Sequence, residues 1–299
     1  MRVAWLVSVT SACSFTPGML SSSPTMDDAS SDADPTTGWS NPVELTELRD
    51  PLGTGADDPS LTDDLLQIYY GTSRSGGQGF EDIWFAKRSS VNDPFGAPEP
   101  VVELNSPMIE TTMRITGNGK AIYFTSNRGG TGQNIYMSTR TDVDQPWSNP
   151  SPVPELSTVN GDWAPFAQSD QLRVILCSGP TEAEEALYVA TRASTQTTWS
   201  ALMRVAELDE TNESECDPVE PRSGVLYYSS NHLNADLRFD IYRASRTGST
   251  APYGNRTAVA SVNKPGVNDR DAWVSADEQT MVFASDRDLV NMQLYITTR

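Results

Sequence analysis

A six-residue motif that recurs five times constrains the fold of this 299-residue chain more than any other feature. Each copy reads apolar, aromatic, any residue, small, any residue, arginine. The copies begin at Ile83, Ile135, Leu187, Ile241 and Leu294, so they lie 52, 52, 54 and 53 residues apart. Such regular spacing indicates one structural unit repeated along the chain.

Each unit contains further segments that are typical of β-strands. A run rich in β-branched and aromatic residues, such as Ile122–Ser126, ends about ten residues before each motif, and polar turns such as Asn127–Gly130 predict a hairpin. An aromatic residue and a turn follow the motif, and then comes a short apolar segment, as at 101–104 and 205–208, that we expect to form an outer strand. Four antiparallel strands in about 50 residues are typical of a β-propeller blade.

The last copy of the repeat ends at its third strand, and its missing outer strand is found near the start of the chain. Trp39–Leu45 matches Trp147–Val153, which follows the second motif. We therefore predict an all-β, five-bladed β-propeller over residues 38–299, with four-stranded antiparallel blades and a ring closed by the N-terminal strand completing the C-terminal blade. An open solenoid leaves this complementarity unexplained.

Two segments carry a resemblance to a known repeat. Ser275–Arg287 resembles the WD40-like (PD40) repeat of TolB-type propellers, whose pattern is Ser-Pro-Asp-Gly-Lys, an apolar strand and Ser-Asp-Arg, and Thr116–Arg128 repeats it. The resemblance extends over most of residues 38–299, with degenerate copies in the other blades. It implies a propeller fold and a role as a binding platform, because one fold supports many activities.

The first residues predict export. Arg2, the apolar run 3–9 and Ser11-Ala12 lead directly to Cys13, and this arrangement resembles a bacterial lipoprotein signal. The resemblance implies lipidation of Cys13 and a periplasmic or outer-membrane location in a bacterium; a plain signal peptide is the alternative. We expect residues 1–13 to be this signal and the Ser- and Asp-rich residues 14–37 to be a disordered tether.

The remaining cysteines and the charge limit the possible partners. Cys177 and Cys216 form either a disulfide, which an exported protein permits, or two buried free thiols. The formal charge is −19, from 21 basic and 40 acidic residues, and this excludes a nucleic-acid ligand. We expect a monomer that meets a membrane only through its lipid anchor.

Acidic residues precede or open the innermost strand of every predicted blade, and these strand starts converge on one mouth of the central channel. They are Asp57, Asp58, Glu110, Asp162, Glu215, Asp217, Asp269 and Asp271. One interpretation is a binding site for a cationic or polar group of a protein or carbohydrate ligand, with Ca²⁺ as the one cofactor that we consider. Trp163 and Trp273 adjoin these acids, and we expect them to stack on a sugar or an aliphatic cation.

A second interpretation is catalytic. Gly55–Ser60 followed by Ile68–Thr72 resembles the first blade of five-bladed arabinanase and xylosidase-type glycoside hydrolases. The resemblance implies Asp58 as general base, Glu215 as general acid and Asp162 as a third carboxylate that tunes a pKa. Inverting hydrolysis needs two carboxyl groups about 6.5 to 9.5 Å apart.

A third interpretation is structural, with the acids accepting hydrogen bonds from backbone amides in turns. His232 is the only histidine, which excludes a histidine-based metal cluster and leaves it a role in a turn. We expect a ligand- or protein-binding or scaffolding module of the cell envelope, with a glycoside hydrolase as the alternative.

Overall fold

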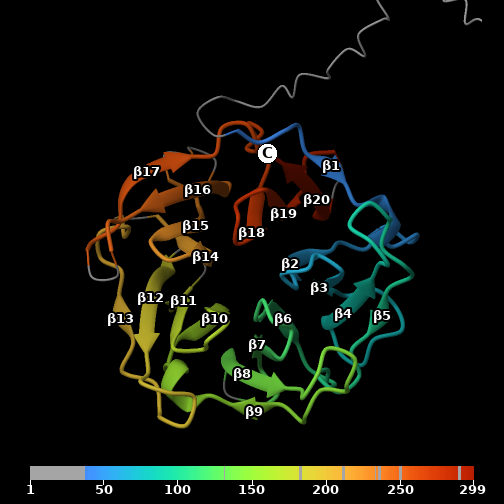
Figure 1. Cartoon of the computed structure of the whole chain (residues 1–299), viewed down its shortest axis with the longest axis horizontal. Coiled ribbons are helices and arrows are strands. Elements are labelled where there is room, and N and C mark those ends of the chain that lie inside the picture. Colours follow the sequence, from blue (N-terminus) through green and yellow to red (C-terminus); the bar gives the residue numbers. More distant parts are fainter. Residues whose placement is uncertain are drawn as a thin grey trace, which may run out of the picture. The chain divides into compact units, whose positions relative to one another are not determined.

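The computed structural model describes residues 38–299 except 131, 182–183, 211–212, 233, 235–236, 249–250 and 289–290. In this part of the chain the strands form five four-stranded antiparallel sheets arranged around a central axis (Figure 1). The predicted five-bladed β-propeller is thereby confirmed. Two short 3-10 helices, η1 (Thr46–Leu48) and η2 (Pro154–Leu156), are found in the described segments.

The strands are grouped by their distance from the axis, and the blades are numbered one to five in the order of their innermost strands. The innermost strands are β2 (Asp57–Leu61), β6 (Glu110–Ile115), β10 (Gly161–Ala167), β14 (Glu215–Arg222) and β18 (Asp269–Val274). The second strands are β3 (Gln67–Thr72), β7 (Ala121–Ser126), β11 (Arg173–Gly179), β15 (Val225–Ser230) and β19 (Thr280–Ser285). The third strands are β4 (Asp82–Lys87), β8 (Asn134–Thr139), β12 (Ala186–Thr191), β16 (Asp240–Ser245) and β20 (Gln293–Thr298). The outer strands are β5 (Glu99–Pro100), β9 (Ser151–Pro152), β13 (Met203–Arg204), β17 (Gly254–Ala258) and β1 (Val43–Glu44).

Blade five combines strands from distant parts of the sequence. β1 pairs antiparallel with β20, with Val43 opposite Ile296, and it lies beside β20 in Figure 1. The backbone N–H of Ser40 donates a hydrogen bond to the carbonyl oxygen of Thr298 at 2.8 Å. The N-terminal strand therefore supplies the fourth strand of the last blade.

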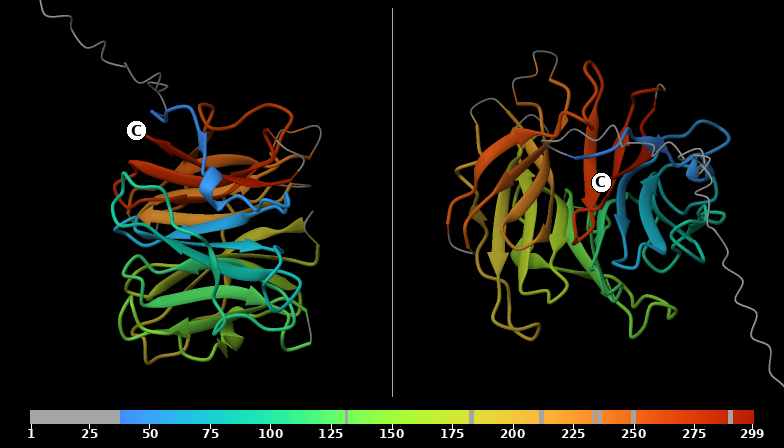
Figure 2. Two further views of the ribbon diagram at one scale, coloured as in Figure 1. Left: turned by 90° about the vertical axis from the view of Figure 1, so that its right-hand side faces the viewer. Right: turned by 45° about the horizontal axis from the view of Figure 1, so that its top comes forward.

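The core lies between the blades. Five clusters of buried apolar side chains each join two neighbouring blades, as where Tyr123 of blade two packs with Leu176 of blade three. Every residue of β7, β15 and β19 is buried, because the second strand of a blade is covered on both faces. The loops lie at the two ends of the ring (Figure 2), where backbone groups can reach water.

The outer strands correct one detail of the sequence analysis. Residues 101–104 and 205–208 were expected to be strands, but the strands β5 and β13 lie two residues earlier. The apolar segments form turns, in which the N–H of Leu104 donates to the carbonyl of Val101 at 3.0 Å. Val101 and Leu104 are three residues apart, so the turn directs both side chains into the core.

The arginine that ends each motif has a repeated partner. It stacks over the aromatic ring of the turn before the outer strand, with the guanidinium carbon 4.1 to 4.5 Å from the ring centroid. The pairs are Arg88–Phe95, Arg140–Trp147, Arg192–Trp199, Arg246–Tyr253 and Arg299–Trp39. This contact explains why the arginine and the aromatic residue recur together in the sequence.

The predicted signal, tether and lipidation site at Cys13 lie outside the described residues. Within the described part of the chain, no helix has the length and apolar character required to cross a membrane.

Candidate functional site

One backbone position is irregular in all five innermost strands. At this position Asp58, Thr112, Ala164, Asp217 and Asp271 have positive φ angles of 47° to 58°. The pairing with the second strand shifts register at the same place in every blade. Left-handed backbone is costly for residues other than glycine, and a β-bulge of this kind redirects a side chain. We call these five residues the axial positions.

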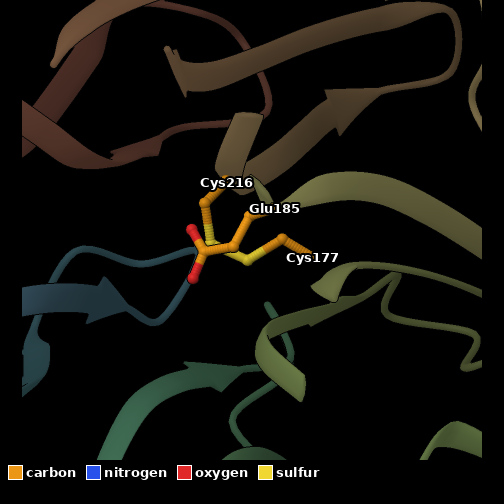
Figure 3. Close-up of side chains that lie close together, drawn as sticks. All are labelled: Cys177, Glu185 and Cys216. Carbon is orange, nitrogen blue, oxygen red and sulfur yellow. A yellow bond between two sulfur atoms is a disulfide. The ribbon is translucent and has the colours of Figure 1, made fainter. Parts of the chain in front are cut away.

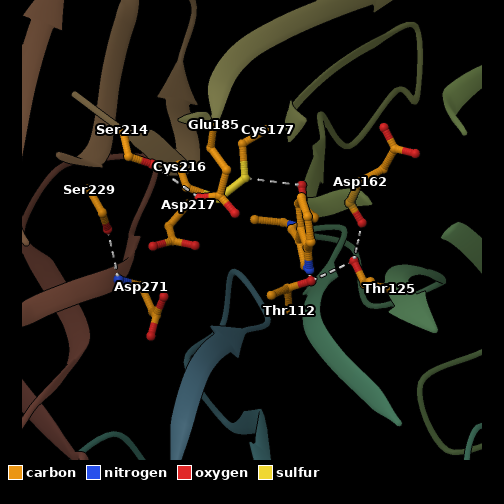
Figure 4. The surroundings of a disulfide bond; sticks show 12 residues. Thr112, Thr125, Asp162, Cys177, Glu185, Ser214, Cys216, Asp217, Ser229 and Asp271 are labelled. Carbon is orange, nitrogen blue, oxygen red and sulfur yellow. Dashed lines mark hydrogen bonds between the residues drawn. A yellow bond between two sulfur atoms is a disulfide. The ribbon is translucent and has the colours of Figure 1, made fainter. Parts of the chain in front are cut away.

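Three axial positions carry aspartate, and their carboxyl groups meet. Asp58, Asp217 and Asp271 are buried, and each offers an oxygen within 4.8 Å of the others. Figure 4 shows the carboxyl groups of Asp217 and Asp271 directed into the same space. Asp57, Asp58 and Glu81 form a second group with the same spacing. The two groups share Asp58, and together they form what we call the axial acid cluster: Asp57, Asp58, Glu81, Asp217 and Asp271.

The cluster contains buried oxygen atoms without partners. Oδ2 of Asp58 accepts hydrogen bonds from the backbone N–H of Thr112 at 2.9 Å and from the hydroxyl of Thr111 at 3.0 Å. Oδ1 of Asp58 and both carboxylate oxygens of Asp217 have no hydrogen-bond partner among the described residues. Buried polar atoms are normally paired, so these oxygens indicate a missing partner.

Two arginines lie against the cluster. Nε of Arg270 is 3.1 Å from Oδ1 of Asp271 and 3.6 Å from Oδ2 of Asp217. Arg114 is buried, and its Nη1 donates to the backbone carbonyl of Pro59 at 3.3 Å. The cluster therefore contains five carboxyl groups but only two neighbouring guanidinium groups among the described residues.

Burial and mutual repulsion shift the pKa values of these acids. Burial raises the pKa of Asp57 and of Asp271 well above its ordinary value. Burial, together with the charge of Asp58, raises the pKa of Glu81 to about 7. Burial is the largest influence on Asp217 and raises its pKa, but the charges of Arg270 and Arg114 and the neighbouring side chains of Asp271 and Ser229 together outweigh burial and hold the pKa of Asp217 below its usual value. The cluster therefore retains protons that a bound cation can replace.

Two adjoining cavities open onto the cluster. One of about 550 Å³ is lined by Asp57, Asp271 and Leu237, and one of about 560 Å³ is lined by Asp57, Glu81 and Leu52. Both cavities are also lined by Asn291 and Met292. The shared residues make the two cavities neighbouring parts of one channel mouth.

Four other acids of the sequence analysis have a structural role. Glu110 shows the pattern: its carboxylate accepts from the N–H of Ser106 at 2.6 Å and from the hydroxyl of Ser126 at 2.7 Å, and it pairs with Arg128 at 3.0 Å. These bonds fasten the loop before an innermost strand to the second strand. The equivalent residues, which we call the latch carboxylates, are Glu110, Asp162, Glu215 and Asp269.

The proposed catalytic acid and third carboxylate are both latch carboxylates. Glu215 accepts from the hydroxyl of Ser230 at 3.3 Å and lies 3.5 Å from Arg256, and burial raises its pKa to about 7. In Figure 4 the carboxylate of Asp162 points away from Asp217 and Asp271. Neither residue belongs to the carboxylate groups that meet at the axis.

The structure places the two tryptophans in different surroundings. Trp273 is only 4% exposed and lies towards the end of β18, where it lines a different cavity of about 270 Å³ with Phe166 and Arg222. Trp163 is partly buried beside the axial Ala164 and packs against the apolar cluster that contains the cysteines. The prediction of two stacking platforms at the acidic mouth is therefore wrong for Trp273, which lies at the opposite end of the strands.

Cys177 of β11 and Cys216 of β14 form a disulfide that joins blades three and four. Their Cα atoms are 5.0 Å apart. Figure 3 shows the carboxylate of Glu185 beside the two sulfur atoms. Cys216 directly precedes the axial Asp217, so the disulfide anchors the strand that carries this acid.

Sequence reasoning missed Glu81, Arg114 and Arg270. Arg114 stands between Met113 and Ile115 on an innermost strand, where a charged residue among apolar neighbours is a signal of a charged channel. Arg270 stands between Asp269 and Asp271, which the sequence analysis read only as acids. Glu81 precedes the third strand of blade one, and no pattern in the sequence distinguishes it from other loop acids.

Neither a protein-family model nor a curated protein matches the sequence. Among solved structures, the chain is similar to an α-L-arabinofuranosidase from Lactobacillus brevis, with 13% identity, a TM-score of 0.57, and coverage of 86% of this chain and 94% of the other. It is also similar to the catalytic domain of a GH62 α-L-arabinofuranosidase from Coprinopsis cinerea, with 11% identity, a TM-score of 0.56, and coverage of 87% and 96%. A TolB protein from Agrobacterium tumefaciens gives 15% identity, a TM-score of 0.50, and coverage of 82% and 77%. At such low identity these similarities establish the β-propeller fold alone.

Proposed function

We propose that this protein is a binding propeller that holds a cationic group of its ligand at the axial acid cluster. The observation that carries the proposal is that the buried Oδ1 atoms of Asp58 and Asp217 have no hydrogen-bond partner among the described residues and lie next to cavities lined by Asp57 and Asp271. A buried oxygen without a hydrogen-bond partner is unfavourable, and a cationic group in the mouth supplies the missing interaction.

The cation can belong to a protein or carbohydrate ligand, or it can be Ca²⁺. Ca²⁺ prefers six to eight oxygen ligands, and the carboxyl groups of Asp58, Asp217 and Asp271 are close enough to share one ion. The guanidinium groups of Arg114 and Arg270 already neutralise part of the negative charge of the cluster. The charge that remains favours a ligand group with a single positive charge over a divalent ion.

We also propose that this binding takes place at a bacterial cell envelope, in a periplasmic or outer-membrane protein anchored through a lipid on Cys13. The lipoprotein-like residues 1–13 and the Ser- and Asp-rich residues 14–37 support this proposal. The tether gives the propeller reach from the membrane surface.

Isothermal titration calorimetry of residues 38–299 tests the binding function. The probes are lysine amide, Ca²⁺ and glucosamine at low salt and pH 7.5. We expect at least one probe to bind, and Asp217→Asn to weaken binding at least tenfold, while Asp144→Asn, at an exposed site, has no effect. If none of the three binds, or if Asp217→Asn binds as well as the wild type, the proposed function is wrong.

A glycoside hydrolase is the second candidate, favoured by one observation. Glu81 has a pKa of about 7 and lines a cavity, as a general acid does. However, oxygens of Asp58 and Glu81 lie within 4.8 Å, which is closer than the separation of about 6.5 to 9.5 Å in inverting enzymes. Release of reducing sugar from arabinan, xylan or aryl glycosides, lost in Asp58→Asn, would establish the hydrolase.

A further inference from the structure

The two cavities at the channel mouth form one groove with apolar ends and an acidic floor. Leu52 lines one cavity and Leu237 the other, and Asp57, Asn291 and Met292 lie where the cavities meet. We propose that this groove binds an extended peptide segment in which a basic side chain is flanked by apolar residues. The proposal rests on the proposed function, since the basic side chain is the cationic group.

The apolar ends are exposed to solvent in the free protein. Leu52 is 80% exposed and Leu237 is 66% exposed. Five of the eight large exposed apolar residues among the described residues lie on loops that lead into innermost or third strands, at the end of the ring that carries the axial acid cluster. They are Leu52, Phe80, Val102, Val159 and Leu237. Of these residues, Leu52 and Leu237 line the two cavities, where exposed apolar side chains can contact a bound partner.

The floor between the apolar ends selects a positive charge. Asp57 is partly exposed and lines both cavities, with Glu81 on one side and Asp271 on the other. A lysine or arginine side chain has an apolar stem that can lie against Met292 while its charged head reaches these carboxyl groups. The formal charge of −19 favours approach of a basic partner.

The lining favours a peptide over a sugar. A sugar ring stacks on a flat aromatic face, but Phe239, the one aromatic residue that lines these cavities in the described part of the chain, has the guanidinium group of Arg270 over its ring at 5.0 Å. The accessible apolar contacts are the aliphatic side chains of Leu52 and Leu237 together with Met292, whose flexible thioether adapts to different partners. Leucine-like side chains of a peptide fit such contacts.

Fluorescence anisotropy with labelled peptides tests the groove. Each peptide carries a central lysine and two leucines, separated from it by two to four Gly or Ser residues. Matched peptides replace the lysine by norleucine or both leucines by serine. We expect at least one spacing to bind the wild type, and either peptide replacement to weaken binding about tenfold or more.

Protein variants locate the contact. Leu52→Ser and Leu237→Ser are each expected to weaken peptide binding about tenfold. Met203→Ser removes an equally exposed apolar residue from the outer strand β13, away from the groove, and should leave binding unchanged. Thermal unfolding of each variant confirms that the fold is retained.

The outcomes separate the two proposals. If lysine amide binds and depends on Asp217, but the peptide leucines and Leu52 and Leu237 have no influence, the groove proposal is overturned and the proposed function stands. If neither lysine amide nor any peptide binds and Ca²⁺ and glucosamine also fail, both proposals are wrong. Competition by neutral xylo- or chito-oligosaccharides that is unaffected by Leu237→Ser would replace the peptide by a carbohydrate ligand.

Discussion

Arg299 lies over the indole ring of Trp39, with its guanidinium carbon 4.4 Å from the ring centroid. The same contact occurs inside each of the other four blades, where arginine and aromatic residue are close in sequence. In blade five the two residues lie 260 positions apart in the sequence. The contact therefore fastens the third strand of the last blade to the segment that enters β1.

Arg299→Ala is expected to lower the free energy of unfolding by about 1 kcal/mol, because the cation–π contact is lost. Chemical denaturation measures the change. Arg88→Ala, which removes the same contact over Phe95 within blade one, is the matched control. An unchanged unfolding midpoint in Arg299→Ala would show that the contact does not stabilise the closing blade.

Glu81→Gln is expected to stabilise the protein at high pH. The pKa of Glu81 is about 7 in the folded state and ordinarily 4.5, so the folded protein binds this proton more tightly than the unfolded chain. The resulting stability is present below pH 4.5 and is lost as the pH rises through 7. Glutamine remains neutral and avoids this loss.

We expect the free energy of unfolding of Glu81→Gln to exceed that of the wild type by about 2 kcal/mol at pH 8 and to differ little from it at pH 4.5. Denaturation at both values measures the difference. Glu155→Gln, at an exposed site, should show the same small effect at both values. If Glu81→Gln changes the free energy of unfolding equally at pH 8 and at pH 4.5, the pKa of Glu81 is not raised in the folded protein.

Removal of the disulfide should destabilise the ring. The double variant Cys177→Ala/Cys216→Ala loses a crosslink between residues 39 positions apart. We expect its free energy of unfolding to be about 2 to 4 kcal/mol lower than that of the wild type. Unfolding curves with and without reductant measure this. Reductant should shift the curve of the wild type but leave that of the double variant in place; a wild type that is insensitive to reductant under unfolding conditions argues against the disulfide.

Glu215→Gln and Asp58→Asn distinguish a latch carboxylate from a member of the axial acid cluster. Glu215 bonds Ser230 and Arg256 inside blade four, so its replacement should change lysine-amide affinity less than twofold. Asp58 faces the cluster, and its replacement should weaken binding about tenfold. If Glu215→Gln folds but loses binding or turnover, the latch assignment fails.

Cation binding should strengthen as the pH rises from 5 to 8. The raised pKa values of Asp57, Glu81 and Asp271 mean that protons compete with the ligand at low pH. Calorimetry in two buffers of different ionisation enthalpy measures the protons released. Affinity that is constant over this range would place the cation elsewhere.

The repeat alone was sufficient to predict the fold. The five motifs and the match of Trp39–Leu45 to Trp147–Val153 supply the number of blades and the pairing of β1 with β20, because hydrophobic alternation and turn chemistry are local properties. The outer strands were placed two residues late, since the buried pair Val101 and Leu104 suits a strand and a turn equally in sequence.

The site was less predictable, because it depends on the shared bulge. The sequence places Glu215 and Asp217 next to each other, but the left-handed residue directs Asp217 to the axis while Glu215 stays in its blade. In blades two and five the latch carboxylate pairs with a loop arginine, Arg128 or Arg287. In blade four His232 takes the place of that loop arginine, and Arg256 of β17 reaches Glu215 instead, which no local sequence pattern predicts. Trp273 was misplaced because distance along an innermost strand determines the end of the channel that a side chain faces.

The axial positions divide between ligand recognition and contacts that join the blades. Each blade contributes one side chain of this kind, and three are aspartate, whereas Thr112 and Ala164 carry no charge. A change at Asp58, Asp217 or Asp271 alters the chemistry of the mouth, because these side chains form the axial acid cluster. Thr112 and Ala164 hold the ring together instead, since the Thr112 hydroxyl accepts from the N–H of Ala164 at 3.0 Å and Ala164 lies in the apolar cluster between blades three and four. Three of the five positions are thus open to natural variation or to protein engineering within the same scaffold.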